Sequence, residues 1–206
     1  MPRHRRLIVA LHGYGGTGAE MAGVLTAAVG DSERQDTRTV VAGPDGPCTP
    51  RFAREGRAWF EISSQPSVIA DRARRAAPAV AEYIARLQQR HRVQARHTGV
   101  VGFSQGASVA AVVVAGSSLC GRAVLVCGRI PAPDSRIPAP DIGHAVPDVL
   151  VVTGGRDRFV QHDAVRADLE RGYGRLARHV VLPELGHEFT EEVARIALAY
   201  VTSTES

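Results

Sequence analysis

The sequence predicts an α/β fold in which a mostly parallel sheet of about six strands carries helices on both faces. Two observations support this prediction. Short apolar runs rich in β-branched residues alternate with longer amphipathic segments along the chain, and strands separated by helices build βαβ units. The runs are also continuously apolar rather than alternating, which is typical of parallel strands whose two faces are both buried.

The expected elements follow from these two patterns. Strands are expected at residues 7–11, 39–42, 98–102, 123–127, 149–153 and 179–182. Helices are expected at residues 19–29, 68–89, 105–115, 162–173 and 191–201. The clearest helix is 68–89, where Val80, Ile84 and Leu87 recur at the spacing that builds one apolar face. Residues 43–57 are rich in Gly, Pro and Arg and are expected to form a long loop.

The length, composition and charge of the chain limit the number of domains and the classes of partner that we expect. The chain has 206 residues, of which 44% are hydrophobic and 22% charged, an ordinary globular composition. This length suits one domain over residues 1–206 and is too short for two. The basic residues are all arginine and exceed the acids by four. Because they form no clustered stripe with interleaved aromatics, no nucleic-acid partner is expected. The composition says nothing about the oligomeric state.

Cysteine usage and the length of the apolar runs favour a cytoplasmic protein. The three cysteines are an odd count and do not suggest a disulfide framework. The apolar run at residues 7–11 is shorter than a signal-peptide core of about 7–15 residues. No segment approaches the roughly 20 apolar residues that span a bilayer, so we expect no membrane span.

The strongest single motif lies between an expected strand and an expected helix. Residues 102–106 read GFSQG, which matches G-x-S-x-G in the strand–turn–helix context that exposes a nucleophilic serine. The two glycines are needed because neighbouring backbones pass too close for a Cβ atom. The helix start adds backbone N–H groups and a positive dipole beside a developing oxyanion. Ser104 is therefore the expected nucleophile.

A serine nucleophile needs a base and an acid, and the chain order Ser, Asp, His selects them. His187 follows the strand expected at 179–182, on a loop before the final helix, and is the expected base. Asp157 follows the strand expected at 149–153 and is the expected acid, which orients the imidazole. Asp163 is the rival acid, although a place in the first turn of a helix also explains it.

The glycine-rich stretch after the first strand allows two interpretations. Residues 13–18 fit G-x-G-x-x-G, which is typical of dinucleotide-binding domains, but the acid expected after the second strand is poorly placed. The other interpretation is an oxyanion loop of the His-Gly type found in esterases. Its first donor would be the backbone N–H of Tyr14, and the N–H of Gln105 would be the second. We favour the oxyanion loop because Ser104 requires one.

Together these segments resemble the phospholipase/carboxylesterase family, which includes acyl-protein thioesterases. The similar segments lie in the family's order at residues 11–15, 57–61, 102–107, 155–157 and 186–188. The resemblance implies an α/β-hydrolase fold, no cofactor, and hydrolysis of carboxylic esters or thioesters. It also implies that the loop carrying Trp59 and Phe60 covers the acyl site and binds substrate. Ordinary core packing is an equally good explanation for Trp59.

One feature departs from the family pattern. The sequence RIPAPD occurs at residues 129–134 and again at 136–141. The prolines of this connection disfavour a helical cap domain, so we expect an open, shallow site.

The sequence thus predicts a serine esterase or thioesterase with Ser104, Asp157 and His187 as catalytic residues, without a metal or a cofactor. The expected partner is a small-molecule ester or thioester. Three alternatives remain open. They are an acyltransferase or cyclase using the same acyl-enzyme, a nicotinamide-dependent oxidoreductase, and a non-catalytic binding module.

Overall fold

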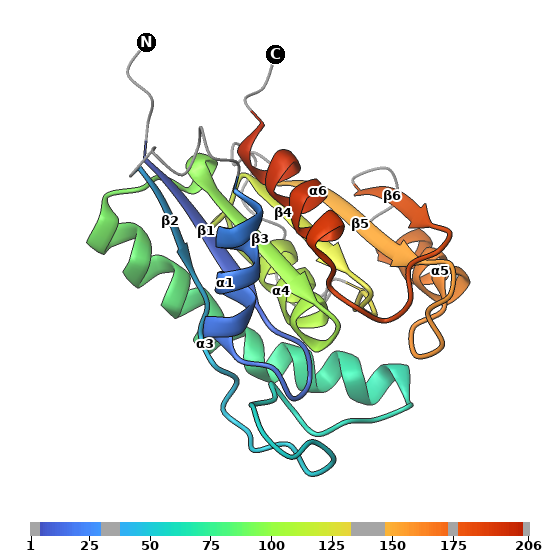
Figure 1. Cartoon of the computed structure of the whole chain (residues 1–206). Helices are drawn as coiled ribbons and strands as arrows, with labels where there is room; N and C mark the ends of the chain where they lie inside the picture. Colours follow the sequence, from blue (N-terminus) through green and yellow to red (C-terminus); the bar gives the residue numbers. More distant parts are fainter. Residues whose placement is uncertain (1–4, 30–37, 133–146, 173–176, 204–206) are drawn as a thin grey trace.

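The structure is a computed structural model that describes residues 5–29, 38–132, 147–172 and 177–203. Its described residues form one six-stranded sheet in the order β2-β1-β3-β4-β5-β6 (Figure 1). All five neighbouring pairs are parallel. The strands are β1 (Arg6–Leu11), β2 (Thr39–Ala42), β3 (Thr98–Phe103), β4 (Arg122–Val126), β5 (Asp148–Gly154) and β6 (Ala177–Leu182). The predicted α/β-hydrolase sheet is confirmed.

Helices cover both faces of this sheet (Figure 1). They are α1 (Gly18–Ala28), α3 (Pro66–His91), α4 (Gln105–Gly116), α5 (His162–Gly172) and α6 (Glu191–Thr202), with a short 3₁₀ turn at Ala95–His97. Helices α1 and α6 share one apolar core with alternate strand residues such as Ile8 and Val124. Helices α3, α4 and α5 share the other core with the intervening residues, such as Leu7 and Leu125. Side chains on both sides of each central strand are therefore buried, which explains the continuous apolar runs.

Differences from the expected elements are confined to their ends. Helix α3 starts at Pro66, where proline suits the first helical turn, and it continues past Pro78 to His91. Strand β4 ends one residue before Cys127, because Cys127 has a φ of 48°. Its N–H still donates to the carbonyl of Val152. Tyr173, expected in the fourth helix, lies outside the described residues.

The expectation about a cap falls partly on residues that the structure does not describe. Residues 133–146, which hold most of the RIPAPD repeat, lie outside the described part. Within the described part, every helix longer than the 3₁₀ turn packs on a face of the sheet, so none forms a cap domain. No described helix combines the length and apolar character needed to cross a membrane.

Candidate active site

Ser104 occupies the sharp turn between β3 and α4. Its φ of 53° and ψ of −114° are a backbone conformation that L-residues rarely adopt, at a cost of about 1–3 kcal/mol. A Cβ atom on Gly102 would lie 2.5 Å from the carbonyl oxygen of Gly106, and one on Gly106 would lie 2.1 Å from that of Leu11. Both positions therefore require glycine, as the motif predicts.

The structure brings the three predicted catalytic side chains into one hydrogen-bonded chain. The Nε2 atom of His187 lies 2.9 Å from Oγ of Ser104, and its Nδ1 atom lies 2.8 Å from Oδ2 of Asp157. The other carboxylate oxygen of Asp157 accepts hydrogen bonds from the N–H groups of Phe159 and Val160, each 2.8 Å long. The buried carboxylate is thus held with Oδ2 toward the imidazole. A proton on Nδ1 then leaves Nε2 free to accept from the serine hydroxyl.

The loops after β5 and β6 are tied together, and this places Asp157 beside His187. The N–H of Gly155 donates to the carbonyl of Leu182, and that of Arg156 donates to the carbonyl of Leu185. A Cβ atom on Gly154 would lie 2.3 Å from the Leu185 carbonyl oxygen. The side chain of Asp163, the rival acid, is 77% exposed and ion-paired with neighbours on its own helix, so it lies apart from this arrangement.

The loop after β1 lies beside Ser104. A Cβ atom on Gly13 would lie 3.4 Å from Cβ of Ser104. The N–H groups of Gly15 and Gly16 are engaged by the Arg57 and Gly13 carbonyls. No described group accepts a hydrogen bond from the N–H of Tyr14 or Gln105, the two predicted oxyanion donors. Their role as donors stays a prediction.

Trp59 and Phe60, the predicted substrate-binding residues, are both buried. The side chain of Gln105 binds their backbone, because its Nε2 donates to the Phe60 carbonyl and its Oε1 accepts from the Trp59 N–H. The indole of Trp59 stacks on His12, and its Nε1 donates to the His12 carbonyl at 2.8 Å. Trp59 therefore supports the loop after β1. Contact of either ring with an acyl group stays a prediction.

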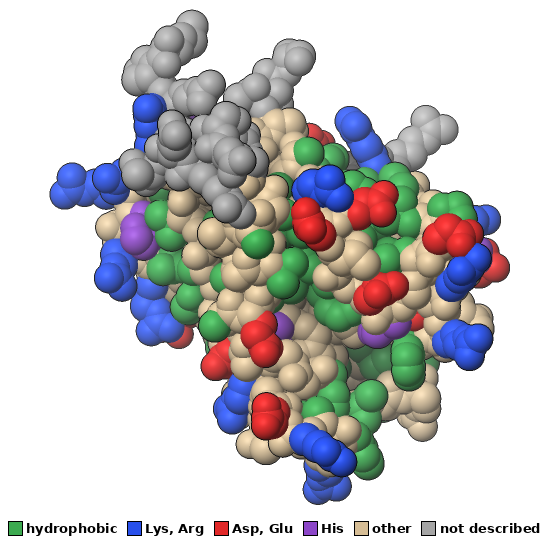
Figure 2. Space-filling view, viewed as in Figure 1, with side chains coloured by type: hydrophobic (Ala, Val, Ile, Leu, Met, Phe, Trp, Pro, Cys, Tyr) green, Lys and Arg blue, Asp and Glu red, His purple; other side chains and the backbone are tan. Residues whose placement is uncertain are grey.

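One aromatic residue beside the site was missed in the sequence. Phe159 is 82% exposed, and its ring centroid lies 5.2 Å from that of His187. Phe52 and Ile62 are also exposed, and the N–H of Phe52 donates to the Tyr14 hydroxyl in the neighbouring loop. Figure 2 shows hydrophobic side chains at the surface near the end of the sheet where the strands finish. The available signal was an aromatic residue two positions after the expected acid.

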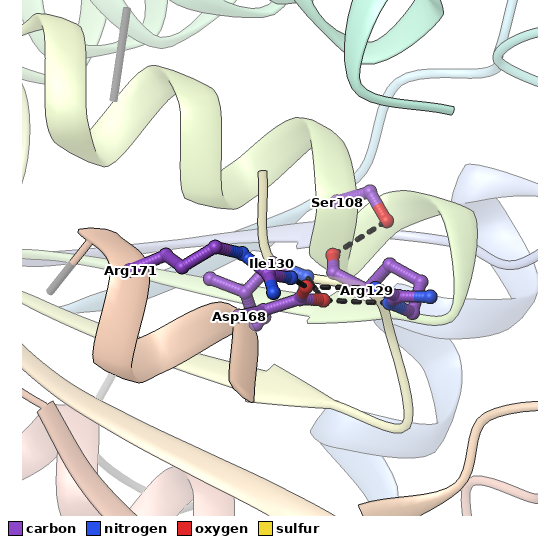
Figure 3. A network of polar contacts seen from close by, with 5 residues as sticks. All are labelled: Ser108, Arg129, Ile130, Asp168 and Arg171. Carbon is purple, nitrogen blue, oxygen red and sulfur yellow. Dashed lines mark hydrogen bonds and ion pairs between the residues drawn. The ribbon is translucent and has the colours of Figure 1, made fainter. Parts of the chain in front are cut away.

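Figure 3 shows a network of ion pairs and hydrogen bonds that joins α5 to the segment after β4. Asp168 on α5 accepts two hydrogen bonds from the Arg129 guanidinium, 2.6 and 2.7 Å long, and one from the Ile130 N–H. Arg171 also pairs with it. A Cβ atom on Gly128, which precedes Arg129, would lie 2.5 Å from the Ser104 carbonyl oxygen. The pair therefore fixes the segment that packs against Ser104.

Removing Asp168 is expected to destabilise the fold strongly. Asp168→Ala would leave the Arg129 guanidinium, whose side chain is 19% exposed, without its carboxylate. Loss of one partner of such a pair costs about 3–5 kcal/mol. The measurement is the free energy of unfolding in urea. Asp163→Ala, on the same helix but exposed, is the control and should cost less than about 0.5 kcal/mol. Equal losses in the two variants would contradict this account.

The two buried cysteines, Cys120 and Cys127, are not candidates for a second nucleophile. Burial raises the pKa of Cys120 and of Cys127 to about 12, so both thiols stay protonated at neutral pH and are poor nucleophiles. Within the described ranges, no three His, Cys, Asp or Glu side chains lie close enough to hold a metal ion.

A comparison with family models identifies the family of this chain. The model of the family described as phospholipase/carboxylesterase matches residues 2–158. No curated protein matches the chain. The crystal structure of esterase PE8 aligns with a TM-score of 0.78 at 23% identity, covering 95% of this chain and 91% of that one. SOBER1 from Arabidopsis thaliana aligns with a TM-score of 0.70 at 20% identity, covering 96% and 97%. Acyl-protein thioesterase 2 from Zea mays aligns with a TM-score of 0.65 at 19% identity, covering 96% of this chain and 94% of that one. At these identities the structural likeness shows the fold alone.

Proposed function

Because the chain belongs to the phospholipase/carboxylesterase family, we propose that it is a serine hydrolase that cleaves a carboxylic ester or thioester. The observation that carries the proposal is the chain of hydrogen bonds from Ser104 through His187 to Asp157. The neighbours described as an esterase and a thioesterase support the same class of substrate. A cytoplasmic location stays a prediction.

The proposed reaction has two halves. In the first, Nε2 of His187 takes the proton of Ser104 as Oγ bonds to the acyl carbon, and the N–H groups of Tyr14 and Gln105 stabilise the oxyanion. His187 then protonates the leaving alcohol or thiol, and an acyl-serine remains. In the second half, His187 activates a water molecule that releases the acid and restores Ser104. Asp157 keeps the proton on Nδ1 and stabilises the imidazolium.

Water is the proposed acyl acceptor. The side chain of His187 is 19% exposed, so solvent reaches the base directly. The test is product analysis with a panel of chromogenic esters and thioesters, with and without an added alcohol or amine. We expect the free acid as the product in both cases. The proposal would be overturned if the protein hydrolysed none of the esters and thioesters in the panel and also did not react with a fluorophosphonate.

We expect kcat/KM for p-nitrophenyl esters to peak at short or medium acyl chains. The exposed Phe159, whose ring centroid lies 5.2 Å from that of His187, offers an apolar rim to the proposed site. Each buried CH₂ strengthens binding by about 0.8 kcal/mol, roughly fourfold. A rim buries only the first few CH₂ groups of an acyl chain, so further groups add little to binding. The measurement is kcat/KM along the series, below each ester's micelle concentration. A steady rise through long chains would contradict the open site.

Phe159→Ala tests the same rim directly. It should lower kcat/KM for a medium-chain ester by about tenfold, a loss of about 1.4 kcal/mol, and leave the acetate ester nearly unchanged. Val24→Ala, which shortens an exposed apolar side chain on α1, serves as the control. Equal losses for all chain lengths would show that Phe159 acts on His187 rather than on the acyl group.

A further inference from the structure

His12 is a buried histidine that the proposed reaction does not use. It follows the last residue of β1 and is 2% exposed. Its ring stacks on Trp59, with centroids 5.1 Å apart. Its Nε2 lies 2.9 Å from the backbone nitrogen of Gly46, and its Nδ1 lies 2.7 Å from the carbonyl oxygen of Gly13. Both ring nitrogens are therefore engaged by backbone groups.

These two contacts determine where the proton of the His12 ring resides. A backbone N–H only donates, so Nε2 must accept from Gly46 with its lone pair. A carbonyl oxygen only accepts, so Nδ1 must carry the proton and donate to Gly13. The ring is thus a neutral Nδ1–H tautomer. A protonated ring would place a second hydrogen against the Gly46 N–H.

Burial of the ring agrees with this neutral form. Burial lowers the pKa of His12 and outweighs the opposing effects of the Gly13 carbonyl, Asp45 and Glu20. Arg57 acts in the same direction as burial. The guanidinium of Arg57 also donates to the Gly46 carbonyl at 2.9 Å, which holds the Gly46 peptide against the imidazole.

The Gly13 carbonyl belongs to the peptide group that carries the Tyr14 N–H. A peptide group is planar and trans, so its C=O and N–H point in opposite directions. Nδ1 of His12 holds the carbonyl at 2.7 Å, and the N–H of Gly16 donates to the same oxygen at 3.2 Å. With the carbonyl held on that side, the N–H of Tyr14 must point to the other. Glycine restricts its backbone least of all residues, so Gly13 itself would not prevent this peptide from turning over. A turned peptide would present a carbonyl oxygen to the oxyanion and repel it.

We propose that His12 is a positioning residue that locks the Gly13–Tyr14 peptide with its N–H directed at the oxyanion. This inference rests on the proposed function. Trp59 completes the lock, because its indole donates to the His12 carbonyl and covers the imidazole ring. The lock acts on the transition state, in which the oxyanion develops, so it affects kcat more than KM.

Two substitutions separate the two contacts of the ring. The amide nitrogen of Asn can replace Nδ1, so His12→Asn keeps a donor for the Gly13 carbonyl. The amide oxygen of Gln can replace Nε2, so His12→Gln keeps an acceptor for the Gly46 N–H. We expect His12→Gln to lose about 10²-fold or more in kcat, the effect of one lost oxyanion donor, with KM little changed. His12→Asn should retain most of the wild-type kcat, although both variants are somewhat destabilised.

The affinity for a trifluoromethyl ketone distinguishes positioning from a merely structural role. This inhibitor forms a tetrahedral adduct with serine, whose oxyanion needs the same N–H groups. Its Ki should rise in His12→Gln by the same factor as kcat/KM falls. The inference is overturned if kcat in His12→Gln matches the wild type, or if both variants lose kcat only in proportion to their unfolded fraction. If the wild-type protein neither hydrolyses esters nor forms the adduct, the proposed function itself fails, and the inference with it.

A measurement on the wild-type protein does not depend on the variants folding. Two-bond ¹H–¹⁵N correlation spectra of ¹⁵N-histidine report the tautomer of each ring. At neutral pH the ring assigned to His12 should show the Nδ1–H tautomer. An Nε2–H tautomer or a charged ring would overturn the inference, whatever the activity.

Discussion

Ser104→Ala is expected to abolish ester hydrolysis, with a fall in kcat of about 10⁶-fold. Removal of a triad serine leaves only binding and oxyanion stabilisation. The same change should prevent labelling by a fluorophosphonate, which adds once to the wild-type protein and should map to the peptide containing Ser104. Kinetics with a chromogenic ester and peptide mass mapping together check both expectations.

Ser108→Ala is the matched control for this experiment. Ser108 lies one turn further along α4 and is buried, and its hydroxyl donates to the Arg129 carbonyl at 2.8 Å. The hydrogen bond of Nε2 of His187 goes to Ser104 and not to Ser108. The Ser108 variant should keep its labelling and most of its activity. Labelling that persists in Ser104→Ala would move the nucleophile elsewhere.

Asp157→Asn is expected to lower kcat by about 10⁴-fold at neutral pH. Two N–H groups, from Phe159 and Val160, point at Oδ1 of this side chain. The oxygen of Asn would take that place, and its NH₂ group would then face Nδ1 of His187. A donor there forces the proton onto Nε2, which can no longer accept from Ser104. The hydrogen bonds around the carboxylate thus make the amide adopt the inactive arrangement.

Asp163→Asn is the control for the acid, because its side chain is exposed on α5. It should change kcat by less than about twofold, within the small effects of surface substitutions. The kinetics of the two variants on one ester give the ranking. A larger loss in Asp163→Asn than in Asp157→Asn would assign the acid to Asp163.

The strands of the sheet could be predicted from the sequence because each strand is marked by a pattern within its own few residues. The four central strands are buried on both faces and apolar almost throughout, and this pattern located each of their ends to within one residue. The edge strands β2 and β6 are only partly buried, and their shorter apolar runs located them to within two residues. The end of β4 was placed one residue too far, because nothing local shows that Cys127 adopts a positive φ. The order of serine, acid and base along the chain selected three residues that the structure places in hydrogen-bonding contact.

Contacts between distant segments were not predictable in the same way. The role of Trp59 depends on a hydrogen bond to a residue 47 positions earlier. Asp168 lies on a helix rich in charged residues, and only its pairing with Arg129, 39 positions away, explains why it is buried. In the sequence nothing distinguishes Phe159 from an ordinary loop residue, and only the structure shows that its ring lies beside His187. Each of these three contacts joins segments that lie far apart in the sequence, so no local sequence pattern predicts it.

The position of β6 has a consequence for the order in which the protein becomes active during synthesis. β6 lies at an edge of the sheet and pairs only with β5, and His187 follows it in the chain. A ribosome delivers the chain from its N-terminus, so Ser104 and the loop after β1 emerge well before their base. The nascent chain therefore holds Ser104, the proposed nucleophile, without His187, the proposed base, until the last strand has been made. The proposed acylation of Ser104 therefore requires that most of the chain has been synthesised, because His187 lies near its C-terminal end.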